Sequence, residues 1–256
     1  MQFTRPLAAF RRMTVGECDV DIRTYGVSGP EVVLIHGIGA SGRYFAPLIQ
    51  ELAGSAVVHT VELPGYGSTR APRRRMDMAD FAAVAVQALQ NAGIRGAQWV
   101  GHSMGCQVVA EMAIAAPEET SSVVLIGPTT NDAERNAPLQ ALRLAQDTLM
   151  EPLPVKWILF TDYLRSGPRW YLKTVPGMVG HRLEERLPLV LLPVLVLRGG
   201  RDPIARASWL RRLAEARPGT RTAALPGQPH VCMYTNPAGT AELLRIESGR
   251  TERAVR

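Results

Sequence analysis

The sequence GHSMG at residues 101–105 lies between a short apolar run at 98–101 and a run with helical spacing at 104–116. A serine in so tight a strand-to-helix turn takes strained backbone angles, and side chains two positions to either side of it would collide. Glycine at both ends of the motif removes those collisions. We therefore predict that Ser103 stands above the end of the strand, with the Met104 N–H and the helix N-terminus facing any negative charge that develops there.

On both sides of this turn, short β-branched runs alternate with longer amphipathic stretches, which is the pattern of parallel strands joined by crossover helices. We predict strands at 18–25, 31–36, 56–61, 98–101, 122–126, 194–197 and 221–225. We predict helices at 44–52, 76–91, 104–116, about 205–216 and about 237–247. The fold class is therefore α/β.

The alternation stops between residues 128 and 188, where no strand candidate occurs and prolines punctuate the chain. This segment holds five of the chain's fifteen aromatic residues in under a quarter of its length. We predict that residues 128–188 form a helical cap, inserted into one α/β core made of residues 1–127 and 189–256.

The sequence HGIG at residues 36–39 directly follows the predicted strand at 31–36. Its two glycines let the loop approach a bound substrate closely. We predict that the N–H groups of Ile38 and Met104 together hold the oxyanion that forms beside Ser103.

An acid and a base occur at matching places farther along the chain. Asp202 lies in a loop after the strand at 194–197, and His230 lies in a loop after the strand at 221–225. In open α/β sheets, catalytic groups gather at the carboxyl ends of the strands. Because Ser103, Asp202 and His230 also follow the nucleophile–acid–base order of this architecture, we predict that they form a catalytic triad.

Together these motifs resemble the α/β-hydrolase superfamily, in its lid-bearing serine hydrolase branch, over residues 18–248. The resemblance implies an eight-stranded, mostly parallel sheet with helices on both faces and a helical cap between strands six and seven. It implies that Ser103 is the nucleophile, His230 the base and Asp202 the acid that orients His230. It also implies that the aspartate-nucleophile branches, the dehalogenases and epoxide hydrolases, are excluded.

The chain departs from the family pattern at two points. The loop LPGYGS at 63–68 matches a family signature, but Glu62 precedes it where an aspartate is usual. Cys106 stands where many relatives have a further glycine, and we expect it to pack behind the turn as a buried thiol. Some relatives place the acid after the sixth strand, so Asp132 or Glu134 is the alternative to the acid named above.

The net charge of +6 looks at first like the charge of a nucleic-acid-binding protein. The basic residues are spread along the chain, however, and the local clusters at 70–75 and 245–256 are diluted by other residues and contain no aromatics. We therefore expect no nucleic-acid partner. Three cysteines and five histidines, scattered without ligand spacing, favour neither a disulfide scaffold nor a metal site.

The longest apolar run, at 187–197, is eleven residues long and contains two prolines, so it is too short to span a bilayer. No apolar stretch of signal-peptide length follows the basic N-terminal residues. We expect a cytoplasmic protein without membrane insertion, as a monomer or homodimer.

These features predict a cofactor-independent serine hydrolase that cleaves a carboxylic ester or related acyl bond through an acyl-enzyme. The aromatic cap predicts an apolar pocket for a small apolar or aromatic substrate. The candidate substrate-binding residues are His36, Gly37, Trp157, Tyr163 and Trp170.

Three alternatives stay open. The first is hydrolysis of a carbon–carbon bond in a β-diketone-like substrate, against which His102 argues mildly, since relatives with that activity often carry asparagine before the serine. The second is thioesterase or lactonase activity. The third is a small-molecule receptor, or another non-hydrolytic protein, on the same scaffold.

Overall fold

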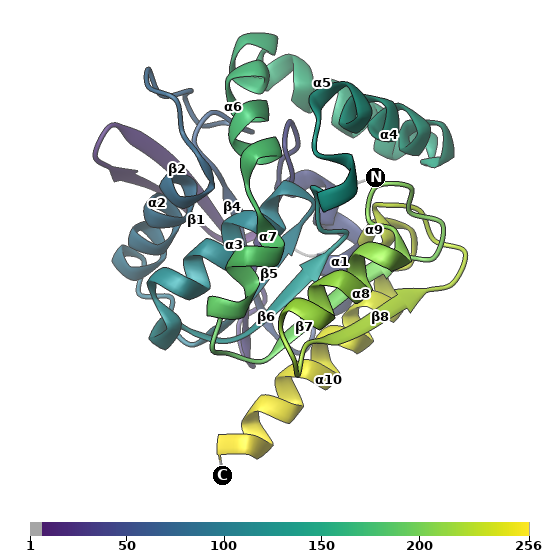
Figure 1. Ribbon diagram of the computed structural model, residues 1–256. Helices are drawn as coiled ribbons and strands as arrows, with labels where there is room; N and C mark the ends of the chain where they lie inside the picture. The colour runs from purple at the N-terminus through teal and green to yellow at the C-terminus, as the bar shows by residue number, and fades with distance from the viewer. Residues whose placement is uncertain (1–6, 256) are drawn as a thin grey trace.

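A single eight-stranded sheet organises the chain in the computed structural model, which describes the backbone of residues 7–255 and the side chains up to residue 248 (Figure 1). The side chains of the basic tail after residue 248 lie outside this description. The strands are β1 (Leu7–Val15), β2 (Cys18–Tyr25), β3 (Glu31–Ile35), β4 (Val57–Glu62), β5 (Ala97–His102), β6 (Thr120–Ile126), β7 (Val194–Gly199) and β8 (Arg221–Leu225). Their order across the sheet is β1-β2-β4-β3-β5-β6-β7-β8, and every pair from β4 to β8 is parallel. The eight-stranded, mostly parallel sheet is therefore confirmed.

The first strand was not predicted from the sequence. β1 pairs antiparallel with β2 at the edge of the sheet, and β2 in turn pairs antiparallel with β4. Most of β1 is exposed, and its sequence LAAFRRMTV lacks the period-two alternation that marks a half-buried strand. Only Met13 and Val15 pack against the core, so local pattern carries little information about this strand.

Helices cover both faces of the sheet, and the two faces bury separate hydrophobic clusters. On β3, Val33 and Ile35 belong to one cluster, whereas Val32 and Leu34 belong to the other. The first cluster includes side chains of α2 (Met78–Asn91), α3 (Met104–Ala115) and α8 (Ala207–Ala216). The second includes those of α1 (Ala46–Leu52), which follows the short η1 (Gly42–Phe45), and of α9 (Cys232–Thr235) and α10 (Pro237–Val255). Strands covered on both faces must be apolar throughout, which is why the inner strands were readable as continuous apolar runs.

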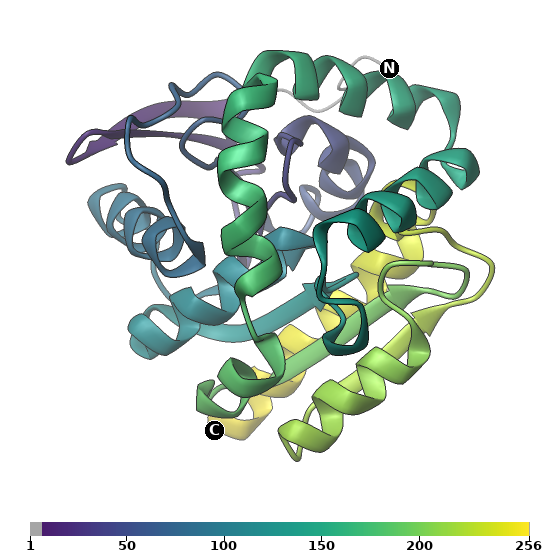
Figure 2. The ribbon, with the colours of Figure 1, turned by 45° about the horizontal axis from the view of Figure 1, so that its top comes forward.

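Between β6 and β7 the chain forms only helices. The longer ones are α4 (Ala137–Met150), α5 (Leu153–Ser166) and α6 (Pro168–Gly180). They arch above the ends of the central strands, as Figure 1 and Figure 2 show from two directions. The short α7 (Leu183–Arg186) returns to the core layer, where Leu183 and Leu187 join the first hydrophobic cluster.

One helix in each part of the molecule begins with a clear side-chain cap. At the start of α2, the Asp77 carboxylate accepts the Asp80 N–H and the Asp80 carboxylate accepts the Asp77 N–H. At the start of α4, the Asn136 side chain accepts the Leu139 N–H at 2.8 Å. Such a cap satisfies backbone donors that the helix itself leaves unpaired.

Candidate active site

Ser103 occupies the strained turn between β5 and α3. Its φ of 56° and ψ of −121° make it the only residue other than glycine with a positive φ in the part of the chain that the structure describes. A Cβ at Gly101 would lie 2.3 Å from the Gly105 carbonyl oxygen, and a Cβ at Gly105 would lie 2.3 Å from the Ile35 carbonyl oxygen. The first glycine therefore lets the turn close on itself, and the second lets α3 lie against the end of β3.

Asp202 and His230 meet at the carboxyl ends of β7 and β8. The Asp202 Oδ2 lies 2.8 Å from the His230 Nδ1, and both side chains are buried. The other Asp202 oxygen accepts the N–H groups of Ile204 and Ala205 at 2.8 and 2.9 Å. The loop after β7 thus fixes the carboxylate, and the carboxylate fixes the imidazole ring.

Burial and charge act in opposite directions on this pair. Burial raises the pKa of Asp202, whereas His230 and the two backbone N–H groups lower it. The lowering is the larger effect, so the pKa lies below its usual value. For His230, burial lowers the pKa, yet the charge and hydrogen bond of Asp202 outweigh it and raise the pKa to about 9. The His230 Nε2 is buried and has no hydrogen-bond partner among the described residues. It is the ring nitrogen that is free to exchange a proton with a substrate or nucleophile.

Two further glycines let the backbone come close to these groups. A Cβ at Gly37 would lie 3.0 Å from the Ser103 Cβ and 3.5 Å from its Oγ. A Cβ at Gly127, just after β6, would lie 2.8 Å from the His230 Cε1 and 3.3 Å from the Asp202 Oδ2. Gly37 was a candidate from the sequence. Gly127 was missed, although a glycine that directly follows a buried strand was the available signal.

A chain of hydrogen bonds links the glycine loop to the histidine loop. The Gly37 N–H donates to the Tyr44 hydroxyl at 2.9 Å, and that hydroxyl lies 2.8 Å from the His102 Nδ1. The His102 Nε2 lies 3.3 Å from the carbonyl oxygen of His230, which can only accept. The Nε2 therefore carries the proton, and the Nδ1 accepts from Tyr44. Burial first, and then His230, hold the pKa of His102 well below its usual value, so the ring is neutral.

Ser103 opens into a cavity of about 180 Å³ below the arch of helices. Ile38 lines it from the glycine loop, and Ile204 lines it from the loop that carries Asp202. The remaining lining residues are Thr129, Ala137, Gln140, Ala141, Leu144, Tyr171, Leu172, Val175 and Met178. Because most of these side chains are apolar, the cavity suits an apolar group next to the serine.

The family model described as "Alpha/beta hydrolase family" matches residues 32–243. The chain belongs to this family. The matched range includes the glycine loop at 36–39, the turn at 101–105 and all three triad candidates.

The relatives include a pimeloyl-(acyl-carrier protein) methyl ester esterase of Aliivibrio salmonicida, 34% identical over 98 residues, which are 38% of this chain and 36% of the relative. The esterase of the same name from Vibrio atlanticus is 32% identical over 233 residues, covering 75% of this chain and 84% of the relative. For the first three relatives, the match spans only 36 to 41% of their own length.

Among solved structures, a thermophilic esterase from Thermogutta terrifontis superposes with a TM-score of 0.80 at 18% identity, covering 95% of this chain and 99% of that one. A hydrolase from Pseudomonas aeruginosa PA01 gives a TM-score of 0.81 at 17% identity, covering 94% and 99%. At these identities the similarity establishes the fold of this α/β hydrolase.

Two buried carboxyls, one on α4 and one on the residue that follows it, reach the histidine loop of this α/β hydrolase from above. The Asp147 Oδ1 accepts the His230 N–H at 3.2 Å, and the Glu151 Oε1 accepts the Val231 N–H at 3.1 Å. Burial raises the pKa of both groups, and the charge of Asp147 helps to raise that of Glu151 to about 8. No local motif marks them, and the residues they contact lie about eighty positions away. Sequence reasoning missed both.

The two alternative acids are engaged elsewhere. Glu134 forms a salt bridge with Arg143, and Asp132 lies 3.4 Å from Arg212. The carboxylate that the structure brings to the His230 ring is that of Asp202.

The three aromatic candidates of the cap do not line the serine cavity. Trp157 points outward and is 65% exposed. Tyr163 packs its ring on Gly39. Trp170 is buried, covers Gly65 and stacks edge-on against the Phe81 ring. Composition placed aromatic residues in the segment, but the direction each one faces depends on how the helices are set on the core.

His36 also lies outside the lining of this cavity. Its Nε2 accepts the Leu63 N–H at 3.1 Å, so its Nδ1 donates to the Gly37 carbonyl at 2.8 Å. With both ring nitrogens used and the ring fully buried, His36 holds the glycine loop and is not among the residues that line the cavity of Ser103. Cys106 packs behind the turn as expected, with its thiol donating to the carbonyls of Gly101 and Ile126.

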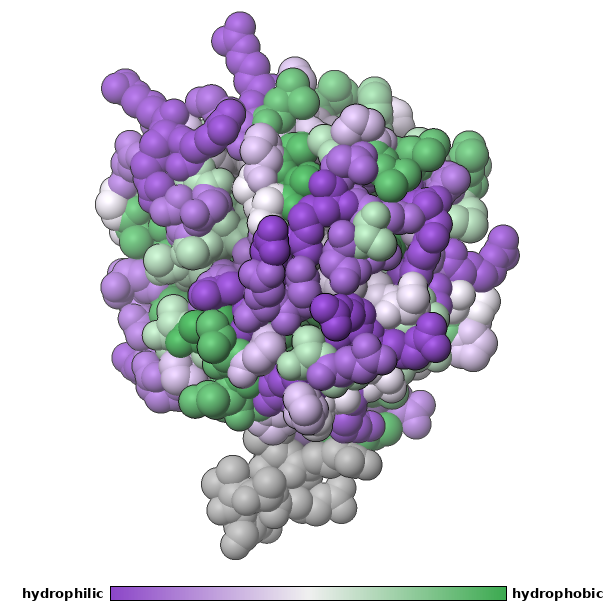
Figure 3. Space-filling model, viewed as in Figure 1, coloured by the Kyte–Doolittle hydropathy of each residue, from purple (hydrophilic) through white to green (hydrophobic). Residues whose placement is uncertain are grey.

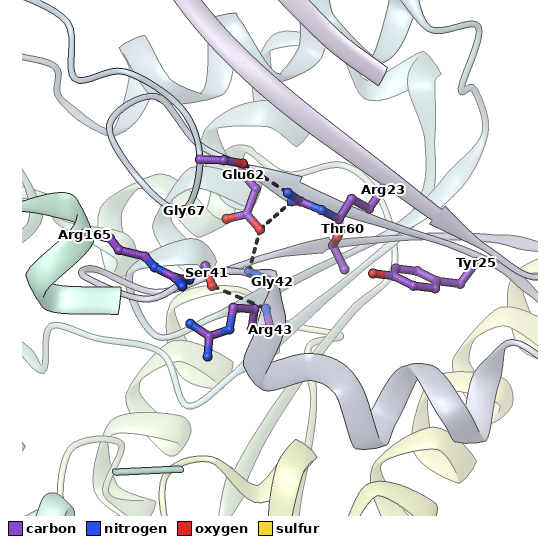
Figure 4. Close-up of a pocket in the computed structure, with 10 residues that line it drawn as sticks. Arg23, Tyr25, Ser41, Gly42, Arg43, Thr60, Glu62, Gly67 and Arg165 are labelled. Atoms are coloured by element: carbon purple, nitrogen blue, oxygen red, sulfur yellow. Dashed lines mark hydrogen bonds and ion pairs between the residues drawn. The ribbon is translucent and has the colours of Figure 1, made fainter. Parts of the chain in front are cut away.

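Glu62 holds the start of η1, just after the glycine loop, beside a pocket of about 250 Å³ that contains none of the triad candidates (Figure 4). Its Oε1 accepts the Gly42 N–H at 3.1 Å and pairs with Arg23 at 3.0 Å. Burial raises the pKa of Glu62 to about 7, and Arg23 opposes that shift. The longer glutamate thus fills the position where relatives carry aspartate.

None of the described helices is both long enough and apolar enough to cross a membrane.

Proposed function

We propose that this α/β hydrolase cleaves carboxylic esters of small apolar substrates through an acyl-enzyme on Ser103. One observation carries the proposal. Ser103 in a strained turn opens into an apolar cavity, and the residue before it, His102, packs its ring 4.6 Å from the ring of His230, whose Nδ1 is held by Asp202 and whose Nε2 has no partner among the described residues. The names of the relatives, several of them methyl ester esterases, point the same way.

In the first half-reaction, the Ser103 Oγ attacks the ester carbonyl while the His230 Nε2 takes its proton. The N–H groups of Ile38 and Met104 hold the resulting oxyanion, and each donor of this kind lowers the barrier by about 3 kcal/mol. The carbonyl re-forms as the C–O bond to the alcohol breaks, and His230 returns the proton to the leaving oxygen. Asp202 keeps the ring in the required tautomer throughout.

In the second half-reaction, water attacks the acyl-enzyme while His230 takes one of its protons. The acid leaves, and the proton returns to Ser103. No step requires a cofactor or metal ion.

The helices between β6 and β7 complete the cavity, and we propose that residues 128–188 act as a cap on a core of residues 1–127 and 189–256. Below the arch, α4 and α6 supply most of the cavity lining. A cavity of about 180 Å³ admits only a small group, so we expect short acyl or alkoxy groups to be preferred at Ser103.

The test is steady-state and burst kinetics on p-nitrophenyl esters of increasing acyl length. Ser103→Ala would be compared with Ser55→Ala, a serine at the opposite end of the sheet. We expect multiple turnovers with an optimum at short chains, lowered about 10⁴-fold or more by Ser103→Ala and unchanged by Ser55→Ala.

Activity that survives in Ser103→Ala would refute the assignment of the nucleophile. A stoichiometric burst without turnover, or no hydrolysis of any ester, would favour a receptor or a carbon–carbon bond hydrolase instead.

A further inference from the structure

The outer surface of helices α4 to α6 carries positive charge and no exposed carboxylate. Residues 137–180 contain three acidic residues, and all three are buried: Asp147, Glu151 and Asp162. The basic residues are exposed or partly exposed, and they include both lysines of the whole chain: Arg143, Lys156, Arg165, Arg169 and Lys173.

The three acids are buried because each one is bound from below. Asp147 and Glu151 accept backbone N–H groups of the histidine loop. Asp162 accepts the Ser41 hydroxyl at 2.6 Å and pairs with Arg43 at 2.8 Å. All three acidic side chains of these helices therefore face the core and bind to it. The charged side chains that remain on the outer side are basic.

The same outer side presents a row of large apolar side chains. On α5, Leu153, Trp157, Phe160 and Leu164 recur at intervals of four, three and four residues, which places them on one face of the helix. They are 79%, 65%, 53% and 65% exposed. Figure 3 shows hydrophobic side chains gathered along the upper rim of the molecule, over this part of the fold. An apolar row of this length on an isolated chain marks a surface that another apolar phase covers.

An apolar groove of about 330 Å³ runs beside this row. It is lined by Leu144, Phe160, Tyr163, Leu164, Pro168 and Tyr171. Two of these residues, Leu144 and Tyr171, also line the cavity of Ser103. The groove and the cavity therefore share a wall.

We propose that this face, defined as the exposed side chains of α5 together with Lys156 and Arg169, docks on an anionic lipid surface. Apolar and aromatic side chains would enter the headgroup layer, while the long basic side chains reach the lipid phosphates. Contact of this kind needs no helix that crosses the bilayer. It goes beyond the proposed ester hydrolysis, and because docking is measured without turnover, either idea can fail without the other.

Charge favours a lipid surface over a second copy of the chain. In a twofold dimer the same face would meet itself, so the cations of one copy would lie against those of the other with no exposed carboxylate of α4–α6 to neutralise them. An anionic lipid surface supplies the opposite charge and the apolar phase together.

The experiment is co-sedimentation of the full chain with phosphatidylcholine vesicles that contain or lack phosphatidylglycerol, at low and high salt. We expect binding that requires phosphatidylglycerol and weakens with salt. The double variant K156Q/R169Q removes two charges, and its partition coefficient should fall roughly fivefold for each lost charge. The double variant L153Q/W157Q should lower it about tenfold or more.

Matched controls lie outside this face, on other elements of the chain. Leu191, just before β7, is 81% exposed, and Arg211 on α8 is also exposed. Leu191→Gln and Arg211→Gln should bind as the unchanged chain does. All six altered residues are at least partly exposed, and circular dichroism verifies that each variant is folded.

Three outcomes would overturn the proposal. The first is no sedimentation with phosphatidylglycerol vesicles. The second is salt-sensitive binding that L153Q/W157Q leaves unchanged, which would mean a purely electrostatic partner such as an acidic protein. The third is concentration-dependent dimerisation, measured by sedimentation velocity, that L153Q/W157Q abolishes while vesicle binding is absent, which would assign the face to a second copy.

Discussion

The core and the helices between β6 and β7 both hold His230 through carboxyl groups. The two contacts differ in how many hydrogen-bond donors each carboxyl has and in the direction of its pKa shift. On the core side, Asp202 has a donor for each oxygen, and its pKa is lowered. On the cap side, Asp147 and Glu151 each accept one backbone N–H, the Glu151 Oε2 has no hydrogen-bond partner in the part of the chain that the structure describes, and the pKa values of both carboxyls are raised. A carboxylate with enough donors stays ionised when buried, whereas a pair that is short of donors retains a proton.

The core and the helices above it therefore hold different parts of His230, its ring and its backbone. The core contact fixes the ring of His230, which acts as the base in the proposed reaction. The cap contacts fix only the backbone of His230 and Val231, so their strength can vary with pH without changing which ring nitrogen faces the substrate.

The strongest test of this contrast makes the same substitution, aspartate to asparagine, at the two carboxyls that contact His230. One of them contacts the ring and the other the backbone N–H. Asp202→Asn should lower kcat about 10⁴-fold, because the amide cannot hold the ring in the productive tautomer. Asp147→Asn keeps an oxygen for the His230 N–H and should cost less than about tenfold. Ester hydrolysis with single-turnover analysis measures both, and equal losses would show that the two carboxyls share one task.

Stability should depend on the proton held by the cap pair. Glu151 keeps its proton up to about pH 8 in the folded chain, whereas an unfolded glutamate releases it near pH 4.5. The free energy of unfolding should therefore fall as pH rises between these values, by a few kcal/mol at about 1.4 kcal/mol per pKa unit. Urea unfolding at several pH values measures the slope.

The matched variant for this slope is Glu151→Gln. His230, with its pKa raised to about 9, contributes a loss of stability of the same sign between pH 6.5 and 9. Glu151→Gln should remove the contribution of Glu151 between pH 4.5 and 8 and leave a smaller slope, to which Glu62 and Asp147, whose pKa values are also raised, still contribute. A slope equal to that of the unchanged chain would show that Glu151 is ionised across the range.

The rate profile should respond as well. Asp202, Asp147 and Glu151 all raise the pKa of His230, and the base is active only when neutral. Glu151→Gln should therefore move the rising limb of kcat/KM to lower pH, by about one unit or less. Glu134→Gln, which removes a carboxylate paired with Arg143 instead, should leave the limb in place.

The smallest expected effect compares the two helix caps. Asp77→Ala at α2 and Asn136→Ala at α4 should each cost about 1 kcal/mol. If the helices of residues 128–188 open independently of the core, Asp77→Ala lowers the global free energy of unfolding. Asn136→Ala then only reduces the hydrogen-exchange protection of the α4 amides. Equal shifts in the unfolding midpoint would mean that core and cap unfold as one unit.

The sequence was informative where a residue's role depends on its neighbours in the chain. The buried strands, the glycines around Ser103 and the loop positions of Asp202 and His230 are all set by local pattern. Their boundaries differ from the observed elements by only a few residues.

It was uninformative where a role depends on what a side chain meets across the fold. Asp147 reads as an ordinary polar residue of an amphipathic helix until α4 is placed over the histidine loop. Trp157 reads as a pocket residue until α5 turns it outward. β1, at the sheet edge with most side chains in solvent, needs little apolar patterning and shows little.

The backbone conformation of Ser103 lowers the stability of the folded chain. Its φ of 56° belongs to a region that costs a residue with a side chain about 1–3 kcal/mol and costs glycine almost nothing. A population of sequences selected only for resistance to heat would drift toward glycine at this position and lose the hydroxyl. A serine at this position therefore costs stability in return for its proposed role as the nucleophile, and screens for stable variants should exclude this position from randomisation.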